Sequence, residues 1–72
     1  MSNNEENRIR MGNDIADLRN QRGMTQQQVA DMAGIKRPHV ARVEKGKYNF
    51  GFDTLQTIAE ALDADIRIVP RK

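Results

Sequence analysis

The sequence predicts a compact all-α bundle of four to five short helices, followed by one short C-terminal β-strand. Apolar residues recur at helical spacing in four segments, caps and glycines delimit these segments, and only residues 65–69 alternate like a strand. With 72 residues and no Cys, the chain has room for one small core, without disulfides or thiolate-bound zinc. So small a core favours support from a partner subunit.

The first predicted helix is amphipathic. Its apolar residues Met11, Ile15 and Leu18 fall on one helical face, with polar and charged residues elsewhere. We expect the helix to end at Gly23, because glycine is favoured just beyond a helix end. The polar residues 1–7 that precede the helix are predicted to be a disordered tail.

The second and third helices are predicted to be short and closely connected. Thr25 and Gln28 have the spacing of a capping box at the start of the second helix, which Gly34 ends. The third helix is predicted over residues 36–45, where Pro38 is tolerated because it lies in the first turn. Only Gly34 and Ile35 connect the two predicted helices, so the chain must make a tight turn between them.

The fourth helix has the clearest pattern of the chain. Leu55, Ile58 and Leu62 lie at positions i, i+3 and i+7, which share one face of a helix. Phe50 and Phe52 stand next to this segment, and we expect both side chains to pack the fourth helix rather than to stack on bases. The fourth helix therefore completes the predicted core.

The predicted strand over residues 65–69 ends at Pro70 and has no partner within the chain. Pairing with the same strand of a second copy would satisfy its backbone groups, so Ile66 and Ile68 are candidate residues of a homodimer interface. A frayed or folded-back tail is the alternative. The chain then divides into a disordered tail (1–7), a folded domain (8–64) and the strand and tail (65–72).

The net charge is only +2, but the charged residues are unevenly distributed along the chain. Residues 35–48 carry five Lys or Arg and one Glu, whereas residues 49–66 carry four acidic residues and no Lys or Arg. A basic segment of this kind is either an ordinary solvated surface or a surface that faces phosphates. The charge pattern alone leaves both alternatives open.

The run from Gly23 to Ile35 is followed by five further marker residues: Val40, Val43, Glu44, Gly46 and Lys47. This pattern resembles the helix-turn-helix of the lambda/434 repressor and Cro (XRE-like) family. The resemblance implies a transcriptional regulator that binds double-stranded DNA sequence-specifically. In such proteins a dimer reads two operator half-sites, each with one recognition helix in the major groove. Here that helix is the predicted helix over residues 36–45.

The resemblance also implies roles for individual residues. Arginine can bond guanine O6 and N7 together, whereas proline offers only an apolar contact, for example with a thymine methyl group. The implied base contacts are Arg37, Pro38 and Arg42, the implied phosphate contact is Gln26, and Arg19 and Glu44 match a structural pair. Further phosphate candidates flank the predicted recognition helix: Lys36, Lys45, Lys47 and Asn49. For Lys45 and Lys47 an ordinary solvated surface is the alternative, and Thr25 and His39 are further candidate contacts.

Several biological contexts are compatible with this resemblance. The C-terminal strand resembles that of HipB-like antitoxins, which repress their own operon and hold a toxin, so a toxin protein is a candidate partner. A phage repressor and a restriction-modification controller are alternatives. A protein-binding module that contacts its partner through the acidic fourth helix, without DNA, is a further alternative.

An enzyme is not expected. The sequence has no nucleophile motif near His39, no glycine-rich phosphate loop and no clustered carboxylates. A single His without Cys offers no metal cluster, and we expect neither metal nor cofactor. No segment has the pattern of a signal peptide or a membrane span, which predicts a cytoplasmic protein without membrane contact.

Overall fold

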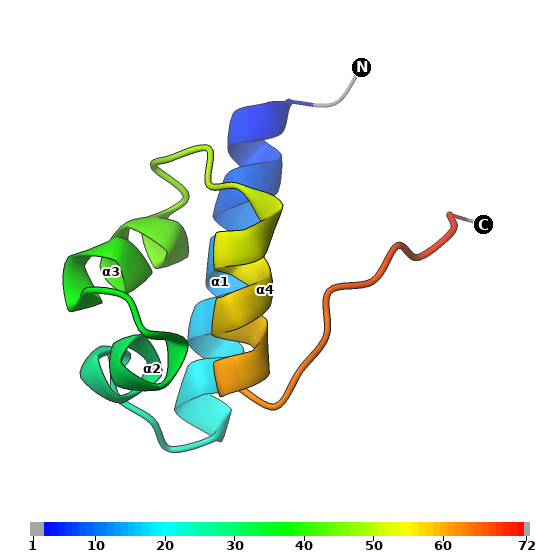
Figure 1. Ribbon diagram of the computed structural model, residues 1–72. Coiled ribbons are helices and arrows are strands. Elements are labelled where there is room, and N and C mark those ends of the chain that lie inside the picture. Colours follow the sequence, from blue (N-terminus) through cyan, green and yellow to red (C-terminus); the bar gives the residue numbers. More distant parts are fainter. Residues whose placement is uncertain (1–2, 72) are drawn as a thin grey trace.

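The computed structural model describes residues 3–71 and contains four α-helices within them (Figure 1). These are α1 (Asn4–Gln21), α2 (Gln26–Ala33), α3 (Arg37–Lys45) and α4 (Phe52–Ala61). The short helix α3 packs against both α1 and α2, and α2 also contacts α4. The predicted all-helical bundle is therefore present with four helices in the described part of the chain.

Helix α1 begins earlier than predicted. The side chain of Asn3 caps the helix by accepting a hydrogen bond from the Glu6 N–H at 3.2 Å. Glu5 and Glu6 lie in the first turn, where negative charge interacts favourably with the helix dipole. Residues 4–7 are thus the first turn of α1 rather than part of a disordered tail, and residues 1–2 of that predicted tail lie outside the described residues.

The capping box of α2 is formed as the sequence predicts. The Gln28 N–H donates to Thr25 Oγ1 at 3.1 Å, and the Thr25 N–H donates to Gln28 Oε1 at 2.8 Å. Gly34 ends α2 with φ +70°, a left-handed conformation that disfavours other residues. Helix α3 begins at Arg37, one residue later than predicted, because Lys36 has extended backbone and acts as its N-cap.

The core lies between the four helices, and Ile15 is its buried residue from α1. Val29, Val40 and Ile58 are fully buried, and Ala30 is the small residue that lets α2 approach its neighbours. Among the aromatic residues next to α4, Phe50 packs against this core, but Phe52 is 62% exposed. The expectation that both pack the fourth helix is therefore wrong for Phe52, which is the first residue of α4.

Two glycines allow α1 and α3 to come unusually close. A Cβ atom on Gly12 would lie 2.5 Å from the carbonyl oxygen of Glu44, and it would also clash with the carbonyl oxygen of Val43. A Cβ atom on Gly46 would lie 2.7 Å from the backbone of Ile9. The direct backbone contact between these helices fixes the position of α3 relative to the rest of the bundle.

The C-terminal segment is not a strand. After α4, residues 64–71 form no regular element and extend away from the bundle (Figure 1). Ile68 is 100% exposed, whereas Ile66 is half-buried. A strand requires a neighbouring strand for its backbone groups, and the described part of this chain provides none. The predicted strand is therefore not formed within the single chain. Its pairing between two copies, and the resemblance to HipB-like antitoxins that rests on it, stay predictions.

Candidate nucleic-acid interface

Helix α3 has one buried and one exposed face. Val40 and Val43 are buried, and their spacing of three residues anchors the helix in the core. The exposed side chains are Arg37, Pro38, His39, Arg42 and Lys45. The three residues to which the resemblance gives base contacts therefore all lie on the solvent side of α3.

A hydrogen-bond network fixes α3 against α1 and α2. Arg19 Nε donates to Glu44 Oε2 at 2.7 Å, and Arg19 Nη2 donates to Glu44 Oε1 at 3.1 Å. A third donor of Arg19, Nη1, bonds the carbonyl oxygen of Met24 at 2.9 Å. The hydrogen bond to Glu44 raises the pKa of Arg19 above its ordinary value, although burial opposes this shift. Arg19 and Glu44 thus form an ion pair inside the fold, away from the exposed face of α3.

Gln26 belongs to the same network. Its Nε2 donates to Glu44 Oε1 at 3.0 Å, so the first side chain of α2 is held by the carboxylate of α3. The free N–H groups at the start of α2 lie beside it, and a helix N-terminus favours a phosphate. Thr25 is already engaged, because its hydroxyl oxygen accepts the capping bond from Gln28.

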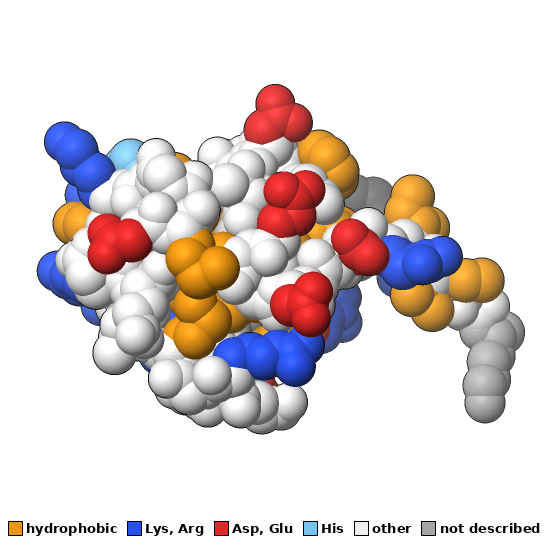
Figure 2. Space-filling view, turned by 60° about the horizontal axis from the view of Figure 1, so that its bottom comes forward, with side chains coloured by type: hydrophobic (Ala, Val, Ile, Leu, Met, Phe, Trp, Pro, Cys, Tyr) orange, Lys and Arg blue, Asp and Glu red, His pale blue; other side chains and the backbone are white. Residues whose placement is uncertain are grey.

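The remaining predicted phosphate contacts lie at both ends of α3. Lys36 precedes the helix and Lys45 is its last residue; Lys47 and Asn49 follow in the loop to α4, and all four are exposed. Figure 2 shows Lys and Arg side chains beside the single His at one end of a molecular face, and others at its lower edge and on the C-terminal segment. The predicted phosphate contacts therefore flank α3 at both of its ends.

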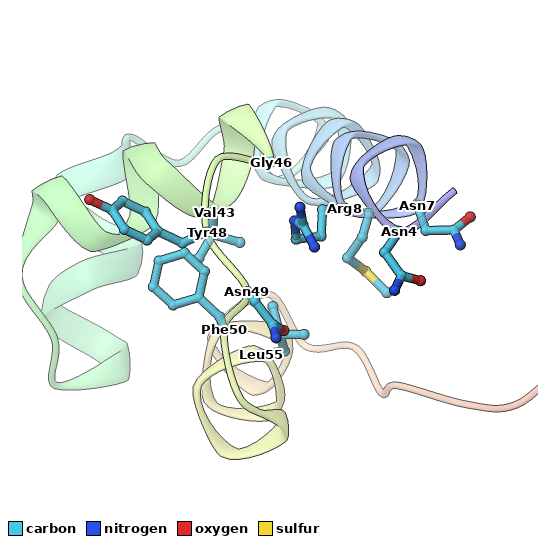
Figure 3. A pocket seen from close by; sticks show the side chains of 10 residues that line it. Asn4, Asn7, Arg8, Val43, Gly46, Tyr48, Asn49, Phe50 and Leu55 are labelled. Carbon is cyan, nitrogen blue, oxygen red and sulfur yellow. The ribbon is translucent and has the colours of Figure 1, made fainter. Parts of the chain in front are cut away.

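The structure adds a residue that the sequence patterns did not single out. Tyr48 lies in the α3–α4 loop, and its ring centroid is 5.1 Å from Cζ of Arg42, a cation–π distance. The Tyr48 ring also meets Phe50 edge-on, with centroids 5.7 Å apart and an angle of 69° (Figure 3). The periodicity of a helix gives no signal for a contact between a helix and the loop that follows it.

An open pocket of about 380 Å³ lies between α1 and the α3–α4 loop. Arg8 lines it together with Asn4, Asn7 and Asn49 (Figure 3), and Arg8 Nε is buried without a hydrogen-bond partner in the described structure. Over residues 3–71 there is no group of three or more His, Cys, Asp or Glu side chains able to hold a metal ion. None of the four helices has the length and apolar character to cross a membrane.

Comparison with known proteins identifies relatives of this domain. The helix-turn-helix family model matches residues 15–69. An HTH-type transcriptional regulator of Haemophilus influenzae is 33% identical over 63 residues, which are 88% of this chain and 64% of that protein. The immunity repressor protein of Bacillus phage phi105 is 32% identical over 59 residues, which are 82% of this chain and 41% of that protein.

A solved structure agrees with the sequence comparisons. The restriction-modification controller protein C.AhdI from Aeromonas hydrophila matches with a TM-score of 0.80 and 28% identity, over 83% of this chain and 91% of that one. This chain spans less than two thirds of the length of either curated relative. The family match extends from within α1, through the tight turn between α2 and α3, to the C-terminal segment. The chain therefore belongs to the helix-turn-helix family.

Proposed function

We propose that this protein is a sequence-specific DNA-binding transcriptional regulator that inserts α3 into the major groove. The observation that carries the proposal is the orientation of α3: its valines are buried, and its two arginines, Arg37 and Arg42, are exposed. The tight turn at Gly34 presents α3 as the second helix of the motif. The names of the relatives, a transcriptional regulator, an immunity repressor and a controller protein, support the same class of function.

The exposed side chains divide into readers of bases and binders of phosphate. Arg37 and Arg42 each read a guanine through paired hydrogen bonds, and Pro38 contacts an apolar group such as a thymine methyl. His39 lies between them and bonds a base or a phosphate. The phosphate binders hold the register of α3 in the groove without reading sequence; they are Gln26 with the α2 N-terminus, Thr25, Lys36, Lys45, Lys47 and Asn49.

The proposal includes a homodimer that binds two half-sites. Proteins of this family bind DNA and commonly act as dimers. Two copies of α3 would occupy half-sites about 34 Å apart and would block a promoter by occlusion. The extended segment after α4 exposes Ile68 fully and Val69 to 78%, and such apolar side chains favour burial against a second copy. In this proposal residues 65–69 of two copies pair as strands.

Fluorescence anisotropy tests DNA recognition directly. The wild-type protein is titrated with a duplex that it has selected from a random library and with a scrambled duplex, at several salt concentrations. We expect a preference of about a thousandfold or more for the selected duplex, and an affinity that falls steeply with salt. Equal and weak binding to both duplexes would refute the proposal.

One substitution assigns this recognition to α3. Arg37→Ala should weaken binding to the selected duplex by about 5- to 150-fold and relax the preference at one base pair of each half-site. Arg10→Ala is the matched control, because Arg10 is also exposed but lies on α1 and bonds Asn7. If both variants lose the same affinity, the protein uses its positive charge without base reading by α3.

A further inference from the structure

Tyr48 and Arg42 form a contact that the proposed roles do not explain. We propose that Tyr48 is a positioning residue, which fixes the guanidinium of Arg42 in the orientation that reads a base. This inference rests on the proposed DNA-binding function and deepens it, because it names a loop residue outside α3 as a determinant of specificity. Tyr48 itself reads no base in this account.

The side chain of Arg42 contacts the Tyr48 ring and keeps its hydrogen-bond donors free for a base. Cζ of Arg42 lies 5.1 Å from the centroid of the Tyr48 ring, so the cation is held by the ring. A cation over the face of an aromatic ring is attracted by the ring, and the guanidinium N–H groups that point away from the ring stay free to donate. Within residues 3–71 no hydrogen bond or ion pair engages the Arg42 side chain, whereas Arg19 uses three of its nitrogen atoms inside the fold. Arg42 is thus restrained while its donors remain available.

The restraint continues into the core. The Tyr48 ring meets the Phe50 ring edge-on, with centroids 5.7 Å apart. Phe50 is partly buried and packs against the core cluster. Figure 3 shows both rings beside each other on the loop between α3 and α4. Phe50 therefore connects the ring that holds Arg42 to the rigid part of the molecule, although Tyr48 is itself 52% exposed.

Restraint matters because a free arginine loses much rotamer freedom when it binds. A side chain that is already ordered loses less, so its contact with the correct base is tighter and its tolerance of a displaced base is lower. Arg37 provides the comparison, because it lies on the same exposed face of α3 and none of the described aromatic rings contacts its guanidinium. The base pair that Arg42 reads should be specified more strictly than the base pair that Arg37 reads.

NMR of the full chain without DNA gives the first test. We expect the Nε–H group of Arg42 to show an upfield ring-current shift and slower local motion than the Nε–H group of Arg37. Both effects should persist in Tyr48→Phe, which keeps the ring, and disappear in Tyr48→Leu. An Arg42 side chain as mobile as that of Arg37 in the wild type would overturn the inference, whatever the result with DNA.

Binding to the selected duplex gives the second test. Tyr48→Leu should weaken binding by about two- to tenfold and relax the preference only at the base pair that Arg42→Ala also relaxes. Tyr48→Phe should bind like the wild type. The double variant of Arg42→Ala and Tyr48→Leu should bind no more weakly than Arg42→Ala alone. Thermal unfolding of each variant checks that the exposed loop substitution leaves the fold intact.

The other outcomes separate the two proposals. Additive losses in the double variant, or a loss in Tyr48→Phe, would mean that Tyr48 contacts DNA itself, which overturns the positioning role but leaves DNA recognition standing. If the wild type prefers no sequence, the proposed function fails and the positioning role fails with it.

Discussion

At Gly12 the absence of a side chain decides how closely α1 and α3 approach. Glycine in the middle of a helix normally costs stability, and alanine there would gain about 1 kcal/mol. The gain is opposed at this position, because an added Cβ would lie 2.5 Å from the carbonyl oxygen of Glu44. Backbone of a packed helix cannot yield as the end of a flexible side chain can, so the steric cost should exceed the gain in helix propensity.

We therefore expect Gly12→Ala to lower the free energy of unfolding by about 1–3 kcal/mol. Asn13→Ala is the matched control: it changes the next residue of the same helix, which is exposed, and should alter the free energy by less than about 0.5 kcal/mol. Urea denaturation followed by circular dichroism measures both. A Gly12→Ala variant as stable as the wild type would show that α1 and α3 do not touch backbone to backbone.

Residue patterns explain which parts of the site could be predicted. The spacing of Val40 and Val43 predicts a buried face of α3 and, by subtraction, the exposure of Arg37 and Arg42. The roles of Gly12 and Tyr48 could not be predicted in this way. Gly12 contacts a helix that lies far along the chain, and Tyr48 contacts Arg42 from a loop, where helical spacing does not apply. One sequence carries no local signal for either contact.

At the scale of elements, one carboxylate joins three helices. Glu44 of α3 accepts two hydrogen bonds from Arg19 of α1 and one from Gln26 of α2. Its side chain is only 7% exposed and that of Arg19 is 15% exposed, so water screens the pair weakly. The orientation of α3 relative to the helix before it therefore depends on this network as well as on the valine anchors.

Removal of the carboxylate should be costly. In Glu44→Ala the guanidinium of Arg19 remains largely buried without its carboxylate partner, and we expect a loss of about 2–4 kcal/mol in the free energy of unfolding. Asp31→Ala removes a comparable side-chain hydrogen bond, from Gln27, on the exposed surface of α2, and should cost about 0.5 kcal/mol or less. Chemical denaturation compares the two variants, and equal losses would show that the Glu44 network stabilises the fold no more than one exposed hydrogen bond does.

Element boundaries were less predictable than element types. All four helices could be predicted, but the polar start of the chain gave no apolar pattern from which to place the first turn of α1 before residue 8. The side-chain cap of Asn3 and the two acidic residues after it supply the local stabilisation instead. The C-terminal segment has the alternating pattern of a strand but forms none within the single chain, because a strand needs the hydrogen bonds of a second strand.

At the scale of the whole molecule, the charges form two regions of opposite sign along the chain. Residues 35–48, which include α3, carry five Lys or Arg and one Glu, and residues 49–66, which include α4, carry four acidic residues. The segment that includes α3 attracts DNA phosphates, whereas the acidic segment that includes α4 is repelled by them. The same net charge of +2 would not orient the protein if the charges were evenly mixed.

The position of the C-terminal segment determines which surfaces stay free in the proposed dimer. The segment after α4 extends away from the bundle (Figure 1), and its apolar residues Ile68 and Val69 are exposed. Pairing of this segment between two copies would leave the exposed face of α3 free in each. The proposed dimer is therefore compatible with simultaneous contact of both recognition helices with one duplex.

Ile68→Asp tests this arrangement, because a charge at this position opposes burial of the segment against another copy. In sedimentation equilibrium we expect the wild type to be dimeric and Ile68→Asp to be monomeric at the same concentration, with weaker binding to a two-half-site duplex. Met32→Asp is the control, since Met32 is an apolar residue of α2 that is 66% exposed and lies outside the segment. A dimer that survives Ile68→Asp but not Met32→Asp would place the interface on α2 and refute strand pairing.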